Sequence, residues 1–301
     1  MTTVRRDRIK PMRYPDVSTV TWPHFDPEAL PAPKADSPSL FAVFAGPLEA
    51  VTQPALGQPR PDRPDRHAPD LATLSDPAFL AERQRRFART YPGGDRRAVA
   101  SIWSKWLYNA VLPTFIGLLM TEGRGWTGER SAIGVVLDSD ARPERLWLRS
   151  PAVIGASVSV GEGLERLMTG LLAPVIETLA RESGASRNVF WSNAGNVVEY
   201  LVGEMAQHPA ITLEAQRDSF AFLDRRHLPS GERNPLWRPV RYRSVPTGQG
   251  EIARLRRVCC IRYLLPATAT CANCPLNCRQ RDAQASGTAG PEVARLAPGM
   301  A

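Results

Sequence analysis

The chain has 301 residues and a net charge of +8, and 43% of its residues are hydrophobic. This apolar content supports a sizeable core and excludes disorder of the whole chain, and no apolar run approaches the ~20 residues of a membrane-spanning helix. The charge comes from 35 Arg and only 3 Lys, a bias that we interpret as compositional rather than as a sign of nucleic-acid binding.

Proline marks the N-terminal part of the chain. Thirteen of the 28 prolines lie between Pro11 and Pro69, so residues 1–74 are predicted to be a proline-rich, loop-rich region. Residues 40–44 are apolar enough for a short strand or helix, and residues 54–70 are expected to form an exposed linker in which His67 is solvated. Arg5-Arg6 is not followed by the apolar segment of an export signal, so we expect a cytoplasmic protein.

After this region the sequence predicts helices and one hairpin, the order of an α+β fold. Apolar residues at helical spacing predict helices over 75–89, from Asp95 to Gly123 with a kink at Pro113, and over 163–181, 193–207 and 212–223. Apolar runs at 132–137 and 145–148 predict a β-hairpin. We therefore expect a mainly helical domain over 75–246 with a small antiparallel sheet, and irregular chain from Pro229 to Pro246.

All five cysteines lie close together, and the first 258 residues contain none. Cys259 and Cys260 are adjacent, Cys271 and Cys274 follow with C-x-x-C spacing, and Cys278 is the fifth. A disulfide framework would spread its pairs along the chain, whereas four grouped thiolates are typical of a metal site. The sequence therefore predicts a cysteine-ligated module over 247–282, followed by a flexible tail over 283–301.

The spacing leaves three kinds of centre open. Zinc sites normally use two spaced cysteine pairs around one ion. Adjacent cysteines in an extended strand point apart, which suits an iron–sulfur cluster with two irons better than a single zinc ion. A redox-active or structural group of thiols is the third interpretation.

Four segments of the chain match motifs of one known family. The pattern R-R-x-C-C-x-R-Y-x-L-P followed by C-x-x-C extends from Arg256 to Cys274, and the segments W-S-K-W, W-S-N-A-G and N-P-L-W-R stand at 103–106, 191–195 and 234–238. On these residues the chain resembles the FhuF-type ferric-siderophore reductases. The resemblance covers roughly residues 75–276 and leaves Cys278 without a counterpart.

The resemblance implies a [2Fe–2S] cluster held by Cys259, Cys260, Cys271 and Cys274. It also implies a cytoplasmic enzyme that reduces ferric siderophores, of the hydroxamate type, by one electron, because ferrous iron binds such oxygens less well than ferric iron. No glycine-rich dinucleotide motif stands between a strand and a helix, so we expect a separate electron donor such as a ferredoxin or a flavin reductase. Arg256, Arg257 and Arg262 are expected to recruit that donor if it is acidic, or to keep the potential accessible.

The siderophore is expected to dock on the helical domain. The candidate contacts are apolar walls and groups that meet oxygens: Trp103, Lys105, Trp106, Trp191, Asn193 and Arg238. One alternative function is a non-catalytic zinc or iron–sulfur protein that binds or senses a partner, including nucleic acid through its arginines. A second is a siderophore synthetase, whose C-terminal domain resembles this family but lacks the cysteines, so the cysteines argue against it.

Overall fold

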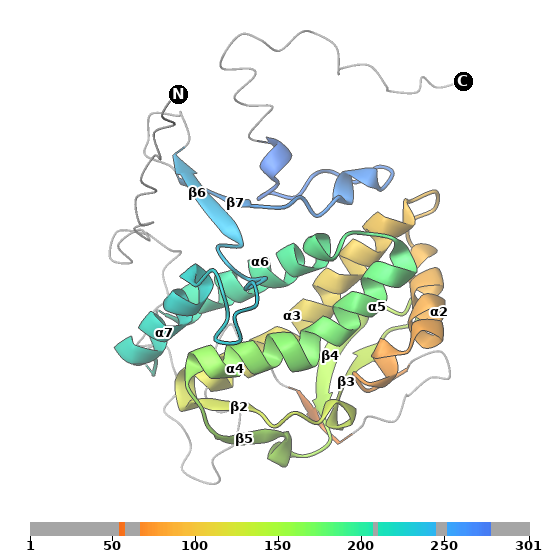
Figure 1. The fold of residues 1–301 in the computed structure, drawn as a ribbon. Coiled ribbons are helices and arrows are strands. Elements are labelled where there is room, and N and C mark those ends of the chain that lie inside the picture. Colours follow the sequence, from red (N-terminus) through yellow and green to blue (C-terminus); the bar gives the residue numbers. More distant parts are fainter. Residues whose placement is uncertain (1–53, 58–66, 207–209, 245–251, 278–301) are drawn as a thin grey trace, which may run out of the picture. The chain divides into compact units, whose positions relative to one another are not determined.

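Helices dominate the fold, and small sheets complete an α+β architecture, with three sheets in the part of the chain that the structure describes (Figure 1). The computed structural model describes residues 54–57, 67–206, 210–244 and 252–277. The helices are α2 (Pro77–Ala88), α3 (Arg96–Glu122), α4 (Val160–Arg166), a π-helix (Leu167–Leu172), α5 (Ala173–Ser183), α6 (Arg187–Met205) and α7 (Leu213–Asp224). The strands are β1 (Ala55–Leu56), β2 (Arg124–Trp126), β3 (Ile133–Leu137), β4 (Pro143–Leu148), β5 (Ile154–Ser157), β6 (Val240–Ser244) and β7 (Ile252–Arg256).

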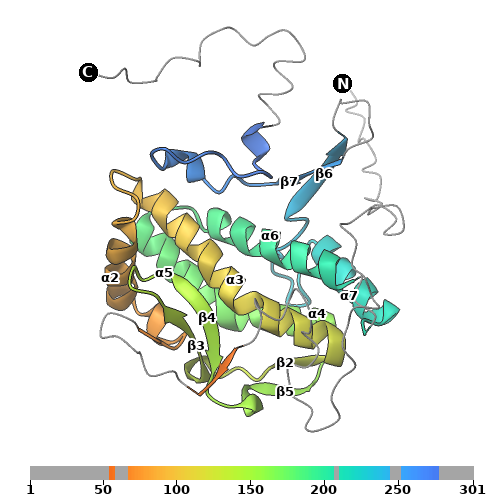
Figure 2. The same ribbon diagram turned by 180° about the vertical axis from the view of Figure 1, so that it is seen from behind.

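Helix α3 is the central element of the core (Figure 2). It begins after Asp95, whose carboxylate accepts the Arg97 N–H at 2.8 Å, and ends at Gly123, which adopts the left-handed conformation with φ of 62°. Most of its side chains are buried on every face, as in a helix enclosed by other elements, and it contacts α6, β4 and β2. The predicted limits of this helix are confirmed, and Pro113 lies inside it without ending it.

Other predicted helices are present with shifted limits. Helix α6 begins at Arg187, not at Asn193, because Ser186 caps it by accepting the Asn188 N–H. The helix predicted over 163–181 begins at Val160 and includes the π-helical turn before α5. Pro174 lies in the first turn of α5, and its missing N–H suits a change of hydrogen-bonding pattern at that point. No helix in the described ranges is long and apolar enough to cross a membrane.

The sheets extend further than the sequence predicts. The hairpin β3–β4 is confirmed as antiparallel, but β1 adds to it parallel to β4. The prediction of an exposed linker over 54–70 is therefore wrong for Pro54, Ala68 and Pro69, which are buried, whereas Leu56 is 58% exposed. His67 is half-buried, and its carbonyl accepts the Leu137 N–H at 2.7 Å. The segment over 40–44 and Cys278 lie outside the described residues.

The hairpin β6–β7 leads into the cysteines. Its strands pair antiparallel from Val240 with Arg256 to Ser244 with Ile252. The hairpin therefore bridges the domain boundary that the sequence predicts between residues 246 and 247, and it gives regular structure to part of a segment predicted to be irregular. Helix α6 contacts β6, which places the end of β7 beside the helical core.

Candidate metal centre

Residues 257–277 follow β7 and contain the four described cysteines, and we call them the cysteine loop. Hydrogen bonds to the backbone of this loop hold it against two helices. The Ser101 hydroxyl of α3 donates to the Cys260 carbonyl at 2.7 Å, and the Ser192 hydroxyl of α6 donates to the Val258 carbonyl at 2.9 Å. A 3-10 helix over Arg262–Leu264 also contacts α3. These contacts tie the loop to the two helices that form the centre of the core.

Four thiols meet in this loop. The sulfurs of Cys260 and Cys271 are 3.7 Å apart, close to the ~3.8 Å expected for two thiolates on one tetrahedral metal with bonds of about 2.3 Å. Cys259 interacts with both Cys260 and Cys274, and Cys260 and Cys274 are buried. In the part of the chain that the structure describes, no three His, Cys, Asp or Glu side chains are arranged around a single ion. Cys260 contacts both Cys259 and Cys271, so it lies in the middle of the group.

Two cations face the thiols from the core. Hydrogen bonds from Cys259 and Cys271, and a further one from Lys105, hold the pKa of the Cys260 thiol far below its usual range. Arg256 is only 5% exposed, and burial is the main cause that lowers its pKa, while Cys260 and Cys271 oppose that shift. Arg256 makes no ion pair with a carboxylate within the described residues. Because a buried charge needs a partner of opposite sign, the thiolates and the anionic centre they would hold supply it.

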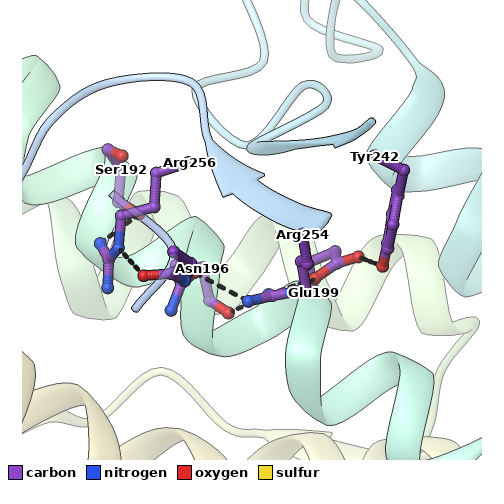
Figure 3. A network of polar contacts seen from close by, with 7 residues as sticks. Ser192, Asn196, Glu199, Tyr242, Arg254 and Arg256 are labelled. Carbon is purple, nitrogen blue, oxygen red and sulfur yellow. Dashed lines mark hydrogen bonds and ion pairs between the residues drawn. The ribbon is translucent and has the colours of Figure 1, made fainter. Parts of the chain in front are cut away.

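A polar network positions Arg256 and the C-x-x-C turn, and Figure 3 shows the part of it that joins Arg256 and Arg254 to α6. Arg256 donates to Asn193 Oδ1 at 2.7 Å and to Asn273 Oδ1 at 3.2 Å. Asn273, which lies between Cys271 and Cys274, also donates to Asn196 of α6. The network therefore fixes the turn from two sides.

The same network continues to a buried carboxylate. Arg254 donates to Asn196 Oδ1 at 3.0 Å and pairs with Glu199, which is 4% exposed and also accepts the Tyr242 hydroxyl. Burial, followed by the charge of Glu199, raises the pKa of Tyr242. This keeps the hydroxyl protonated as a donor, so strands β6 and β7 are both joined to α6.

Two backbone features shape the surroundings of the cysteines. Ile261 adopts φ of 52°, a conformation that is strained for a β-branched residue, and its N–H donates to Cys259 Sγ at 3.3 Å. A Cβ on Gly195 would lie 2.6 Å from Pro239 Cβ. The glycine of W-S-N-A-G therefore lets the loop before β6 approach α6 closely.

Three residues that were predicted to contact the substrate or the electron donor are buried in the structure and have other contacts. Trp103 is 0% exposed, and its indole N–H donates to the Ala141 carbonyl at 2.7 Å. Asn193 is also 0% exposed and donates to Ser101 and Ser104, so neither side chain offers a surface to a ligand here. Arg256 is buried, which contradicts the expectation that it recruits an electron donor.

The other predicted substrate residues retain exposed surface. Lys105 lies beside Cys260, so it faces the centre itself. Trp106 is 40% exposed and Arg142 stacks on it at 4.8 Å. Trp191 is half-buried against the core, and Arg238 pairs with Asp224.

Several residues of the site were not predicted from the sequence. They are the hydrogen-bonding residues that hold the loop: Ser101, Ser192, Asn196, Glu199 and Asn273. The position of Asn273 inside C-x-x-C is a local signal for its role. For Glu199 the signal is a carboxylate within a largely apolar helix, because such a group needs a buried partner.

Four grouped thiols beside the buried Arg256 and the half-buried Lys105 define a protein with a thiolate-ligated, anionic metal centre. The family model described as "FhuF 2Fe-2S C-terminal domain" matches residues 256–276, and that described as "Ferric iron reductase FhuF-like transporter" matches residues 101–252. The chain therefore belongs to the FhuF family of ferric iron reductases, and its cofactor is a [2Fe–2S] cluster.

A curated relative carries a matching name. The "Ferric siderophore reductase" of Escherichia coli (strain K12) is 26% identical over 184 residues, which are 60% of this chain and 67% of that protein. Among solved structures, the aerobactin synthetase IucC from a hypervirulent pathotype of Klebsiella pneumoniae matches with a TM-score of 0.43 and 19% identity. That match covers 58% of this chain and 37% of the synthetase, and so weak a likeness carries no functional argument.

Proposed function

We propose that this protein reduces ferric siderophores of the hydroxamate type by one electron in the cytoplasm and so releases ferrous iron. The observation that carries this proposal is the group of four thiols held against α3 and α6, with two cations directed at it. When bound, a [2Fe–2S] cluster supplies electrons one at a time. Fe³⁺ bound by anionic oxygens needs a single electron to become the more weakly held Fe²⁺.

Each group of residues has a proposed role. Cys259, Cys260, Cys271 and Cys274 hold the cluster. Lys105 and Arg256 balance part of its negative charge, which favours the reduced, more anionic state. Ser101 and Ser192 fix the loop backbone. These roles need no general acid or nucleophile, because iron reduction breaks no covalent bond of the siderophore.

The siderophore and the electron donor are both proposed to bind to exposed side chains. Lys105, Trp106, Trp191 and Arg238 keep exposed surface and remain the proposed siderophore contacts. The electron is proposed to come from a separate donor such as a ferredoxin or a flavin reductase. Tyr263, which is 51% exposed in the 3-10 helix of the cysteine loop, gives such a donor a surface close to the cluster.

Stopped-flow reoxidation tests the reductase proposal. Anaerobic protein reduced with dithionite and freed of excess reductant should regain its oxidised visible spectrum when a ferric trihydroxamate is added, and a ferrous chelator in the same cuvette should capture Fe²⁺. The gallium complex of the same siderophore is the matched control and should leave the spectrum unchanged. Identical traces with the ferric and gallium complexes would reject the proposal and favour a sensor or binding protein.

A further inference from the structure

Three arginines surround one tryptophan beside the cysteine loop, and two more lie near one of them. The guanidinium carbons of Arg257, Arg226 and Arg238 lie 4.5, 5.4 and 5.8 Å from the centre of the Trp237 ring. Arg233 and Arg241 are exposed and lie close enough to Arg257 to act on its charge. We call this set the Trp237 patch: Trp237 with Arg226, Arg233, Arg238, Arg241 and Arg257.

The positive charge of the Trp237 patch is poorly balanced by the protein. Asp224 pairs with Arg238, whereas Arg226, Arg233, Arg241 and Arg257 make no ion pair within the described part of the chain. The guanidinium groups of Arg226, Arg238 and Arg257 all lie within 5.8 Å of the centre of one indole ring. Like charges held this close repel one another and attract a counter-anion.

The patch is attached directly to the cysteine loop. Arg257 is two residues before Cys259, so their Cα atoms are no more than about 7 Å apart. The Arg257 N–H donates to the Pro239 carbonyl at 3.1 Å, and its guanidinium donates to the Trp237 carbonyl at 3.0 Å. These bonds hold the tryptophan and its arginines next to a proposed cluster ligand.

We infer that the Trp237 patch binds the carboxylate groups of the ferric siderophore, so that chelates with net negative charge are the preferred substrates; this inference rests on the proposed reductase function. Three hydroxamates already neutralise Fe³⁺, so further carboxylates make the complex anionic. Arginine recognises a carboxylate through two parallel hydrogen bonds, and the indole face packs against the hydrocarbon arms. The bound cluster, once reduced by the donor, would supply the one electron that converts Fe³⁺ to Fe²⁺.

The arrangement favours a small anion over an acidic protein. Three guanidinium groups converge on the area of one indole ring, whereas even weak protein–protein interfaces spread over several hundred Å² on each partner. An acidic electron donor is therefore the competing occupant that the experiment must separate.

Binding to the cluster-loaded protein is measured with gallium(III) complexes, which cannot be reduced under these conditions. Calorimetry compares a citrate-based dihydroxamate complex, which is anionic, with an uncharged trihydroxamate complex. The anionic complex should bind at least tenfold more tightly at low salt. Arg226→Gln combined with Arg233→Gln should weaken its binding about tenfold, leave the uncharged complex within twofold, and slow cluster reoxidation by the anionic ferric complex in parallel. Arg145→Gln, which removes an exposed charge from β4, is the matched control and should change neither.

Three outcomes overturn the inference, and a fourth overturns the reductase proposal on which it rests. Equal affinity for the two complexes, or equal effects of the patch variant and Arg145→Gln, would show that the patch does not select the anion. A patch variant that slows only reduction by an acidic ferredoxin would assign the patch to the donor. If no ferric complex reoxidises the cluster, the reductase proposal fails, while the gallium titrations still decide separately whether the patch binds the anion.

Discussion

The helical core around α3 and the cysteine loop that lies against it are stabilised by different kinds of contact. The core is continuous apolar packing from α2 to α7, in which many side chains each contribute about 1.5–3 kcal/mol by burial. The loop adds Leu265 to this packing, but most of its attachment comes from a small number of polar contacts, made by Ser101, Ser192, Asn193 and Asn196. A buried polar group that loses its partner is costly, so the loop should be far more sensitive to a single substitution than the core.

The largest expected effect is loss of the cluster without loss of the helical core. Cys271→Ser should abolish nearly all visible absorbance of anaerobically purified protein, because a hydroxyl is a poor ligand for the cluster. The far-ultraviolet circular dichroism should remain, because the core does not depend on the thiol. Cys278→Ser is the matched control and should keep both signals. Loss of the helical signal with Cys271→Ser would show that the core needs the bound centre.

A buried polar substitution tests how the loop is attached. Asn193→Leu removes the acceptor of Arg256 and the donors to Ser101 and Ser104, and should lower the free energy of unfolding in urea by about 3 kcal/mol. Asn188→Leu, on the exposed face of the same helix, should change it by no more than about 0.5 kcal/mol.

The double variant sharpens this result. Adding Arg256→Leu to Asn193→Leu removes the cation that has lost its Asn193 acceptor, so the pair should cost less than the sum of the two single substitutions. Additive losses would mean that Asn193 and Arg256 act independently, against the network in Figure 3.

The smallest expected effect lies at the start of the central helix. Hydrogen bonds from Arg97 lower the pKa of Asp95 from 3.8 to about 2. The charged form therefore stabilises the folded protein above about pH 4, and this contribution is lost as the pH falls towards 2. Because solvent screens the partly exposed Asp95 carboxylate, Asp95→Asn should lower the free energy of unfolding by only about 0.5–1 kcal/mol at pH 7.

Urea unfolding from pH 7 down to pH 2.5 measures this effect. The difference between Asp95→Asn and the parent chain should shrink at the acid end. Arg97→Gln should reproduce part of the loss, and adding it to Asp95→Asn should have little further effect. A difference that stays constant with pH would show that the charge of Asp95 does not contribute.

The core could be predicted from the sequence because its determinants are local. Helix α3 has an aspartate before its first turn and a glycine after its last, and β3 and β4 are short apolar runs joined by a turn. Strand β1 was missed because two residues carry no periodic pattern, and only its partner β4 shows that it is a strand. The early start of α6 depends on the Ser186 cap, a weaker signal than the apolar pattern that begins later.

The site could be predicted only in part. The cysteine spacing indicates the centre, and the family motifs locate the residues near it, but a motif does not state which way a side chain faces. Trp103 and Asn193 share motifs with Lys105 and Trp191, yet only the first two are enclosed in the core. The partners of Asn193 lie 92 and 89 residues away in the chain, so its role depends on the packing of α3 against α6 and not on its neighbours in sequence.

The bond from Ser101 to the Cys260 carbonyl joins residues 159 positions apart, and this has a consequence for how the protein is made. Both helices that receive the loop are synthesised before the first cysteine leaves the ribosome. Contacts within and between α3 and α6 have shorter sequence separation and form faster than those that span the whole domain. In the nascent chain, α3 and α6 should therefore already be packed together when the cysteine loop is synthesised and binds to them. Iron and sulfide would then be delivered to a nearly finished protein, with docking of the loop as the closing step of its maturation.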